Sequence, residues 1–464
     1  MESFSIADYL TGSASLERVA VQSKEISLTY SELADYVPHL ATNLDRLGIR
    51  AGETVGLATK DPLRSFLLAL ALGWRGCRWF RATREAVFST SLFYDHVLSD
   101  THRSRPPQGR FHLLGDVLEW PGGGAPKDAY RFKKDEIVLF GQSSGTTGEP
   151  KILPMTAAQL NSRSRPELLL DDSVVPGVAS GFHSLHMVSF YTFLRTFRKG
   201  GMVVFDKCSE NTTHILLSPV MASEFVQRAP QSRAKIHSCW IGGGPLYPAL
   251  ARKLLDRFQN VVYTYGSQEA GNASYRNITS PNDIGDQADV GQLASGVDLK
   301  VVLEDGGSVL AGEPGIIRYR TDSMISGYLG DSETAMVDGY FQPGDLGILH
   351  SSGRLSISGR IAEQFNLGGV KLNANWIDEV VLSVDGVTDA ISATTVDQGG
   401  REHLLIGYAS SVAVAAVEKS IRDQLRKKFG NVADNKLVIK RLEAIPRNEN
   451  GKLDRRRFAR FVHA

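Results

Sequence analysis

The chain has 464 residues, of which 42% are hydrophobic and 22% are charged, and its formal net charge is +1. This length is too great for one hydrophobic core, so two or three domains are expected. The balanced charge gives no electrostatic reason to expect nucleic acid or an anionic membrane as a partner. No apolar run approaches the ~20 residues that a transmembrane helix needs, so no integral membrane segment is expected.

The start of the chain and its cysteines indicate a cytoplasmic protein. The first residues lack the basic and then apolar segments of a secretory signal. Cys77, Cys208 and Cys239 are far apart and lack the spacing of metal ligands. They therefore predict buried thiols in a reducing compartment.

The first elements in the chain are a helix, a strand and a second helix. The pattern predicts a helix from Thr29 to Gly48, a short strand over residues 55–58 and an apolar helix over residues 66–72. Residues 103–127 are rich in proline, glycine and arginine, which is typical of a loop.

The next stretch, residues 142–151, has a composition that suits a polyphosphate. It follows an apolar run at 137–140, which predicts a buried strand, and it precedes Thr156 and Gln159, which have capping-box spacing for a helix start. The stretch holds four hydroxyl residues, two glycines and a lysine. Backbone amides, hydroxyls and one cation can together bind phosphates, although a polar surface loop has the same composition. Its spacing differs from that of a Walker A loop, since two residues separate Gly148 from the lysine.

Further along, His183 and His186 precede an apolar helix that ends near residue 199, and a strand follows at 202–205. No third metal ligand lies near this pair in the sequence, so a packed or pocket-lining histidine is expected rather than a metal site. Residues 296–330 alternate apolar and polar positions between turns, as in a small β-barrel or sheet. The C-terminal part predicts a strand at 402–409, a helix at 414–429 and a strand at 436–440.

Five segments carry a family resemblance. Ser143 to Lys151 match Thr/Ser-Ser-Gly-Thr-Thr-Gly-x-Pro-Lys at every position, and the chain resembles the adenylate-forming enzymes: acyl-CoA synthetases, peptide-synthetase adenylation domains and luciferases. The other four segments follow in the family's order and are residues 240–246, 265–269, 339–347 and 446–455. The resemblance as a whole runs from about residue 15 to residue 460.

The resemblance implies an α/β fold with a large N-terminal domain of α/β subdomains plus a small β-barrel, and a small mobile α+β C-terminal domain. The expected division is an N-terminal adenylation domain at residues 1–358, a hinge at 359–362 and a mobile domain at 363–464. The first subdomain is expected to be abbreviated, because the phosphate loop comes early in this chain.

The resemblance also assigns site residues. The expected catalytic residues are Lys452, Glu269, Lys151 and Gln268, with Glu269 and Thr147 as metal ligands. The acyl pocket is assigned to His186, Gly242 and Gly266. The expected nucleotide- and CoA-binding residues are Ser143, Ser144, Gly145, Thr146, Thr147, Gly148, Gly243, Gly244, Tyr265, Gly266, Asp345, Arg360, Gly368 and Gly369. The basic run at 455–457 is typical of a solvated face.

This chain departs from the family pattern at a few positions. Gln268 replaces a threonine, Gln342 and Pro343 replace an arginine and a threonine, and Ala362 stands where the hinge is normally Asp or Lys. Amino-acid-activating members carry an aspartate for the substrate ammonium near residues 182–192, and none occurs there. An α-amino acid substrate is therefore disfavoured.

The implied function is that of a ligase. It activates a small carboxylic acid with ATP and Mg²⁺ to acyl-AMP, releases pyrophosphate, and transfers the acyl group to a thiol, with CoA as the leading acceptor. One alternative is a stand-alone adenylation enzyme that loads an acyl or peptidyl carrier protein. Another is a degenerate member that binds nucleotide as a regulator, against which the presence of Lys151, Glu269, Asp345 and Lys452 argues.

Overall fold

The computed structural model gives two compact units. The N-terminal unit comprises Met1–Gly285, Gly291–Leu299 and Tyr319–Phe341, and the C-terminal unit comprises Asp286–Val290, Lys300–Arg318 and Gln342–Ala464. The division at residues 358 to 363 stays a prediction. The structure describes residues 3–11, 16–89, 91–101, 107–115, 128–143, 151–165, 173–206, 209–228, 235–285, 288–310, 312–330, 335–367, 370–396, 402–410, 412, 414–430, 437–447 and 453–463.

The first sheet of the N-terminal unit has six strands and is parallel except at one edge. Its central strand, of sequence Thr-Val-Gly-Leu-Ala, is buried at every position, as expected for a strand covered on both faces. The edge strand runs antiparallel to its neighbour. In spatial order the strands are β10 (Lys151–Thr156), β9 (Ile137–Ser143), β5 (Arg78–Arg81), β4 (Thr54–Ala58), β6 (His96–Ser99) and β7 (Arg110–Leu113).

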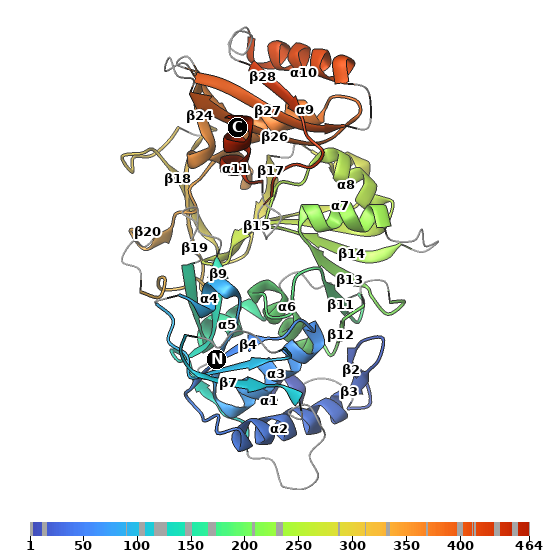
Figure 1. Cartoon of the computed structure of the whole chain (residues 1–464), viewed down its shortest axis with the longest axis vertical. Helices are drawn as coiled ribbons and strands as arrows, with labels where there is room; N and C mark the ends of the chain where they lie inside the picture. The colour runs from blue at the N-terminus through green and yellow to red at the C-terminus, as the bar shows by residue number, and fades with distance from the viewer. Residues whose placement is uncertain are drawn as a thin grey trace. The chain divides into compact units, whose positions relative to one another are not determined.

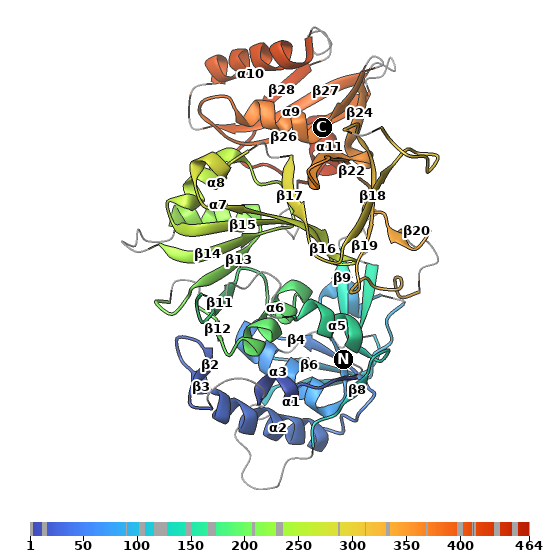
Figure 2. The ribbon, with the colours of Figure 1, turned by 180° about the vertical axis from the view of Figure 1, so that it is seen from behind.

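The second sheet of this unit is parallel through its centre and antiparallel at its ends. Helices α7 (Pro219–Arg228) and α8 (Pro248–Leu255) lie side by side along it (Figure 2). The strands within this unit, in spatial order, are β16 (Gly271–Ile278), β15 (Phe258–Ser267), β14 (Ile236–Ile241), β13 (His214–Leu217), β11 (Gly177–Ser180), β12 (Met202–Val204), β2 (Val19–Gln22) and β3 (Ser27–Thr29).

Helices between the sheets' strands supply the core of the unit. Phe66, on the apolar face of one helix, packs against Phe190, Phe193 and Phe197 of another, with ring centroids 5.3 to 6.0 Å apart. The longest helix of the unit is α2 (Tyr30–Arg46), and its N-cap residue Thr29 forms a capping box with Glu32. The helices are α1 (Ala7–Leu10), α2 (Tyr30–Arg46), α3 (Pro62–Arg75), α4 (Arg84–Val87), α5 (Ala157–Arg163) and α6 (Met187–Arg198), and the short strands are β1 (Ser3–Phe4), β8 (Phe132–Lys133), β20 (Met336–Val337) and β21 (Tyr340–Phe341).

The C-terminal unit contains an antiparallel pair, β22 (Asp345–Leu349) and β23 (Arg354–Arg360), with β19 (Gly315–Arg320) beside β22 through Gly315 and Ile316. It also contains a three-stranded sheet of β26 (Val387–Val396), β27 (Glu402–Ser410) and β28 (Leu437–Arg441). The other elements that lie wholly or partly in it are β17 (Asp289–Leu293), β18 (Asp298–Val302), the 3-10 helix η3 (Ile361–Glu363), β24 (Gln364–Leu367), β25 (Val370–Asn373), α9 (Ala374–Leu382), α10 (Val414–Phe429) and α11 (Arg455–His463).

Helices cover both faces of the three-stranded sheet (Figure 1). Successive side chains of β27 point to opposite faces, so its apolar residues pack with different helices. Leu404, Ile406 and Tyr408 pack with residues of α9 and α10, whereas Leu405 packs with Phe458 of α11. Strands β27 and β28 are parallel, and α10 connects them. This arrangement confirms the strand, helix and strand predicted for residues 402–440.

The structure confirms the α/β fold class and the helices predicted around residues 29–48, 66–72 and 187–199. Two predictions are wrong. The stretch from 142 to 151 is not all loop, because Ser143 ends β9 and Lys151 begins β10. Residues 103–127 are not all loop either, since Arg110–Leu113 form β7 at the edge of the first sheet. In the parts of the chain that the structure describes, no helix is long and apolar enough to cross a membrane.

Candidate active site

Two antiparallel strands hold the two ends of the predicted phosphate loop. Ser143 pairs with Lys151 in the register of β9 and β10. The entrance is fixed by Gln142, whose Oε1 accepts a hydrogen bond from Thr83 Oγ1 at 2.8 Å and whose Nε2 donates to the Arg81 carbonyl at 2.6 Å. The predicted loop residues Ser144, Gly145, Thr146, Thr147 and Gly148 lie outside the described residues.

Glu269 lies in the turn between β15 and β16 and is only 8% exposed. Its Oε1 accepts a hydrogen bond of 3.0 Å from the Tyr328 hydroxyl. The ring of Tyr328 also lies 4.6 Å from Lys151 Nζ, within the range of a cation–π contact. The structure therefore brings two predicted catalytic residues to one tyrosine, with Glu269 at its hydroxyl and Lys151 at its ring.

Gln268 faces the start of α6. Its Nε2 lies 3.2 Å from Nε2 of His186. In this orientation the carboxamide nitrogen donates and His186 Nε2 accepts. The ring of His186 stacks on Phe182, with centroids 5.0 Å apart and an angle of 25° between the planes. The predicted pocket histidine thus belongs to the same group as Gln268.

Behind this turn lies Arg163, the last residue of α5, which is 4% exposed. Its guanidinium donates to the backbone carbonyls of Gln268 at 2.8 Å and of Glu269 at 3.1 Å. It also donates to the Ser323 carbonyl at 3.0 Å. Burial lowers the pKa of Arg163 from its usual value, but a guanidinium stays protonated in proteins. Arg163 therefore fixes the backbone that presents Gln268 and Glu269.

The predicted glycines lie where strands come close together. A Cβ on Gly242, just after β14, would come 2.7 Å from Thr264 Oγ1, and one on Gly266 would come 2.4 Å from the Gly271 carbonyl oxygen. Gly243 has φ of +83°, which favours glycine. Gly244 follows in the same turn, and its carbonyl accepts a hydrogen bond from the Tyr263 hydroxyl at 3.3 Å.

Tyr265 lies on β15 at the register shift of its pairing with β16. It is half-buried, and its ring centroid is 6.4 Å from that of Tyr319. The ring is thus supported from one side by another aromatic residue. An aromatic residue held in this way can pack on a flat base.

The C-terminal unit holds two predicted nucleotide-binding residues next to each other. Asp345 of β22 is 6% exposed and pairs across the strands with Arg360 of β23, with Oδ1 and Nε 3.0 Å apart. In the same unit, Arg318 Nε donates a hydrogen bond to Gln342 Oε1 at 2.8 Å. Gln342, which departs from the family motif, therefore has a hydrogen-bond partner within the unit. Gly368, Gly369 and Lys452 lie outside the described residues.

The basic run near the C-terminus is only partly solvated, which corrects the prediction for residue 455. Arg456 and Arg457 are exposed, but the side chain of Arg455 is 12% exposed. It pairs with the buried carboxylate of Asp378 at 2.7 Å and donates to Asn375 Oδ1 and to the Ser392 carbonyl, each at 2.8 Å.

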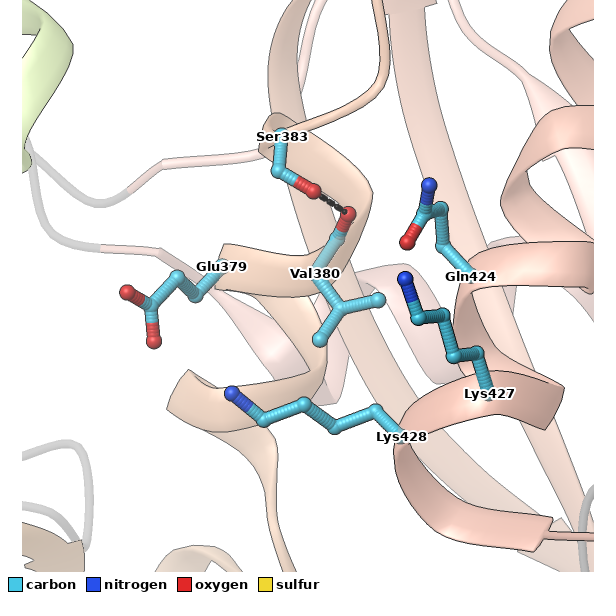
Figure 3. A pocket seen from close by; sticks show the side chains of 6 residues that line it. All are labelled: Glu379, Val380, Ser383, Gln424, Lys427 and Lys428. Carbon is cyan, nitrogen blue, oxygen red and sulfur yellow. Dashed lines mark hydrogen bonds between the residues drawn. The ribbon is translucent and has the colours of Figure 1, made fainter.

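A surface groove in the C-terminal unit lies between α9 and α10 (Figure 3). It contains none of the predicted site residues, and most of its lining is charged or polar. It therefore does not fit an acyl pocket. Its lining residues are Glu379, Val380, Ser383, Gln424, Lys427 and Lys428.

Mg²⁺ fits the donor set in the N-terminal unit. Among the described residues, no group of three or more His, Cys, Asp or Glu side chains is placed to hold a metal by itself. Mg²⁺ commonly keeps its waters and binds through one or two carboxylates together with substrate phosphates. A single buried carboxylate such as Glu269, with one oxygen held by Tyr328, meets that requirement.

Sequence reasoning missed Tyr328 and Arg163. Both contact the Gln268–Glu269 turn from more than 50 residues away in the chain. For Arg163 the sequence gives only one weak indication of a role, namely its position at the end of the helix that follows the predicted phosphate loop.

Known proteins resemble this chain over most of its length. It is 25% identical to a probable CoA ligase, CCL9, from Humulus lupulus, over 95% of this chain and 92% of that protein. It is 27% identical to pseudomonine synthase PmsE from Pseudomonas entomophila, over 77% of this chain but only 61% of that protein. The structure of O-succinylbenzoate coenzyme A synthetase from Bacillus subtilis in complex with AMP is 19% identical, and the match covers 98% of this chain and 98% of that chain with a TM-score of 0.82.

The family described as AMP-binding enzyme matches residues 88–329, which is just over half of the chain. That segment begins before β9 and ends just after Tyr328, so it contains the whole Lys151, Gln268 and Glu269 group. The chain therefore belongs to the AMP-binding enzyme family, within the adenylate-forming superfamily that its motifs resemble.

Proposed function

We propose that this protein is an AMP-forming acid–thiol ligase that activates a carboxylic acid with ATP and passes the acyl group to a thiol, with CoA as the leading acceptor. The observation that carries the proposal is the group formed by Lys151, Tyr328 and Glu269 at the base of the phosphate loop. It places one cation and one buried carboxylate beside the predicted polyphosphate site. Similarity to a probable CoA ligase supports the same reaction class.

In the first half-reaction, a carboxylate oxygen of the substrate attacks the α-phosphorus of ATP, and the bond to pyrophosphate breaks. Both reactants are anions, so cations must offset their repulsion. Lys151 would hold the phosphates of the leaving pyrophosphate and Lys452 would orient the carboxylate. Glu269 would hold Mg²⁺, which supplies positive charge against the phosphate oxygens. Asp345 would accept hydrogen bonds from the ribose hydroxyls.

In the second half-reaction, the thiol releases its proton, its sulfur attacks the acyl carbon, and AMP leaves with the bonding electrons. The C-terminal domain would rotate about Ala362, withdraw Lys452 and bring Gly368 and Gly369 to the acceptor. A small residue at the hinge can absorb the backbone rotation.

The acid is proposed to be an aryl acid. The stacked rings of Phe182 and His186 offer a flat surface for an aromatic group next to Gln268. Relatives at 22 to 24% identity include 4-coumarate–CoA ligase 1 of Solanum tuberosum and a 2-succinylbenzoate–CoA ligase of Bacillus cereus. A cytoplasmic location is proposed on the thiols of Cys77 and Cys239, which are both buried and free, while Cys208 lies outside the described residues.

A second candidate is a stand-alone adenylation enzyme that loads a carrier protein. A relative from Streptomyces, 24% identical over 70% of this chain, is named both a salicylyl-CoA synthase and a salicylate adenylyltransferase. The two candidates share the first half-reaction and differ only in the acceptor. A panel of aryl and alkyl acids, each assayed for pyrophosphate release with CoA, with a carrier protein and with neither, separates them. Release that depends on CoA supports the ligase, and release that depends on the carrier supports the second candidate.

Replacement of the predicted catalytic lysine tests the division of labour. Lys452→Ala should abolish acyl-AMP formation but leave thioester formation from supplied acyl-AMP close to native, since the second step does not use this lysine. ATP–pyrophosphate exchange and single-turnover thioester formation measure the two steps separately. Native exchange activity in the variant would contradict the assignment of Lys452.

A further inference from the structure

Tyr328 is held in place by backbone hydrogen bonds on both sides. The amide of Ile325 donates to the carbonyl of Glu269 at 2.9 Å. The amide of Leu329 donates to the carbonyl of Ile152, next to Lys151, also at 2.9 Å. The segment from 325 to 329 therefore joins the turn that carries Glu269 to the strand that carries Lys151.

Further contacts fix the start of the same segment. Gln159 Nε2 donates to the Met324 carbonyl at 2.7 Å, and Arg163 donates to the Ser323 carbonyl. Both donors come from α5, the helix that follows β10. The side chain of Tyr328 thus projects from a backbone that is anchored at four points, so its position relative to Glu269 and Lys151 is determined by the fold.

The two parts of the Tyr328 side chain act on different groups. The hydroxyl has one proton, and it donates that proton to Oε1 of Glu269. A carboxylate held through one oxygen presents the other in a defined direction. The electron-rich ring face lies beside the Lys151 ammonium, which it attracts and locates.

We propose that Tyr328 is a positioning residue of the metal–nucleotide site: its hydroxyl orients the Glu269 carboxylate toward Mg²⁺, and its ring places Lys151 for the phosphates. This inference rests on the proposed function. It predicts that the two roles can be separated, because one substitution removes the hydroxyl alone and another removes the ring as well. Hydrogen-bond partners of carboxylates that bind metals typically change metal affinity by about 10- to 100-fold when removed.

The test measures binding rather than turnover, on the full chain. Calorimetry with α,β-methylene-ATP gives nucleotide affinity without Mg²⁺ and its dependence on Mg²⁺ concentration. Mg²⁺ should strengthen nucleotide binding, and Tyr328→Phe should raise the Mg²⁺ concentration that gives half of this strengthening by about tenfold. The same variant should leave the affinity for the nucleotide without Mg²⁺ unchanged. Tyr328→Leu should also weaken Mg²⁺-free binding several-fold, since Lys151 loses the ring.

Tyr30→Phe is the matched control. Tyr30 is a buried tyrosine of the same unit, and its hydroxyl donates to the Gly201 carbonyl at 2.6 Å. This variant loses a buried hydroxyl without touching Glu269 or Lys151, and it should bind as the native protein does. Thermal unfolding of every variant checks that the fold is retained.

A double-mutant cycle gives a second readout. In a Glu269→Gln background, adding Tyr328→Phe should change the Mg²⁺ dependence no further, because the oriented carboxylate is already gone. A native Mg²⁺ dependence in Tyr328→Phe would overturn the inference, as would an equal loss of binding with and without Mg²⁺. If the native protein itself binds no Mg²⁺–nucleotide, the proposed function fails, which is a different outcome.

Discussion

Two largely enclosed arginines, Arg163 of the N-terminal unit and Arg455 of the C-terminal unit, have different kinds of partner. Arg163 of the N-terminal unit donates to backbone carbonyls, including those of Gln268 and Glu269. Arg455 of the C-terminal unit pairs with the carboxylate of Asp378 and also donates to Asn375 and Ser392. In the sequence, Arg455 stands three residues after Lys452.

The difference lies in what each arginine organises. The planar guanidinium can donate in several directions at once, so Arg163 gathers three carbonyls and thereby fixes a backbone turn. The oxygens that accept its hydrogen bonds are uncharged backbone carbonyls, and burial lowers its pKa. Arg455 instead compensates a buried charge. Burial raises the pKa of the Asp378 carboxyl, and Arg455 opposes that shift. The hydrogen bonds of Arg163 thus fix the turn that carries Gln268 and Glu269, whereas the contacts of Arg455 in α11 join that helix to α9 and β26.

The largest effect is expected where one charge of the buried pair is removed. Asp378→Ala should destabilise the C-terminal unit by about 3 kcal/mol, because Arg455 loses its close, fully buried partner and keeps only the more exposed Glu363 carboxylate, 3.8 Å from its Nε. Urea unfolding of the full chain, monitored with a spectroscopic probe in the C-terminal unit, measures this loss of stability.

Asp389→Ala is the control for this experiment. Asp389 forms a two-oxygen contact with Arg447 at 2.8 Å in the same unit, but the side chains are 33% and 27% exposed. Its removal should cost no more than about 1 kcal/mol. An equal loss in the two variants would show that burial does not distinguish the pairs.

A smaller but more specific effect is expected from Arg163→Lys. An ammonium on a flexible stem cannot reach the carbonyls of Gln268, Glu269 and Ser323 together, so at least one buried carbonyl loses its donor. The expected loss of stability is about 2–3 kcal/mol, and acyl-AMP formation should fall because the Glu269 turn is no longer held. Arg165→Lys is the control, since Arg165 is half exposed and pairs with exposed Asp322. Native adenylation in Arg163→Lys would contradict the role assigned to Arg163.

The sequence predicted elements that carry a strong local pattern. In β27 the apolar residues alternate faces, and α10 has its buried Val417, Ile421 and Leu425 four residues apart. The strand β10 escaped prediction because it contains Pro154, which is unusual in a sheet interior. The structure explains the exception: β10 is an edge strand of its sheet, where proline is tolerated.

For the site, the family motifs placed Lys151, Gln268, Glu269 and His186, and the structure groups them in one unit. The residues that hold this group were not predictable. Tyr328 and Arg163 act through contacts between positions 59 to 160 residues apart, and no local periodicity encodes such contacts. The burial of Arg455 was missed for the same reason, because a run of three arginines is ordinarily a solvated surface.

The smallest effect is the coupling between Arg447 and Asp389, and its response to salt sharpens the comparison. Alanine variants of both residues, alone and together, form a double-mutant cycle. Because this pair is partly exposed, its coupling energy should be about 0.5–1 kcal/mol at low salt and should shrink toward zero in about 1 M salt. The same cycle for Arg455 and Asp378 should give a coupling that persists in salt, since counter-ions cannot enter the buried site. A salt-sensitive Arg455–Asp378 coupling would mean that water reaches the pair, and the contrast between a site-shaping and a packing arginine would then rest on Arg163 alone.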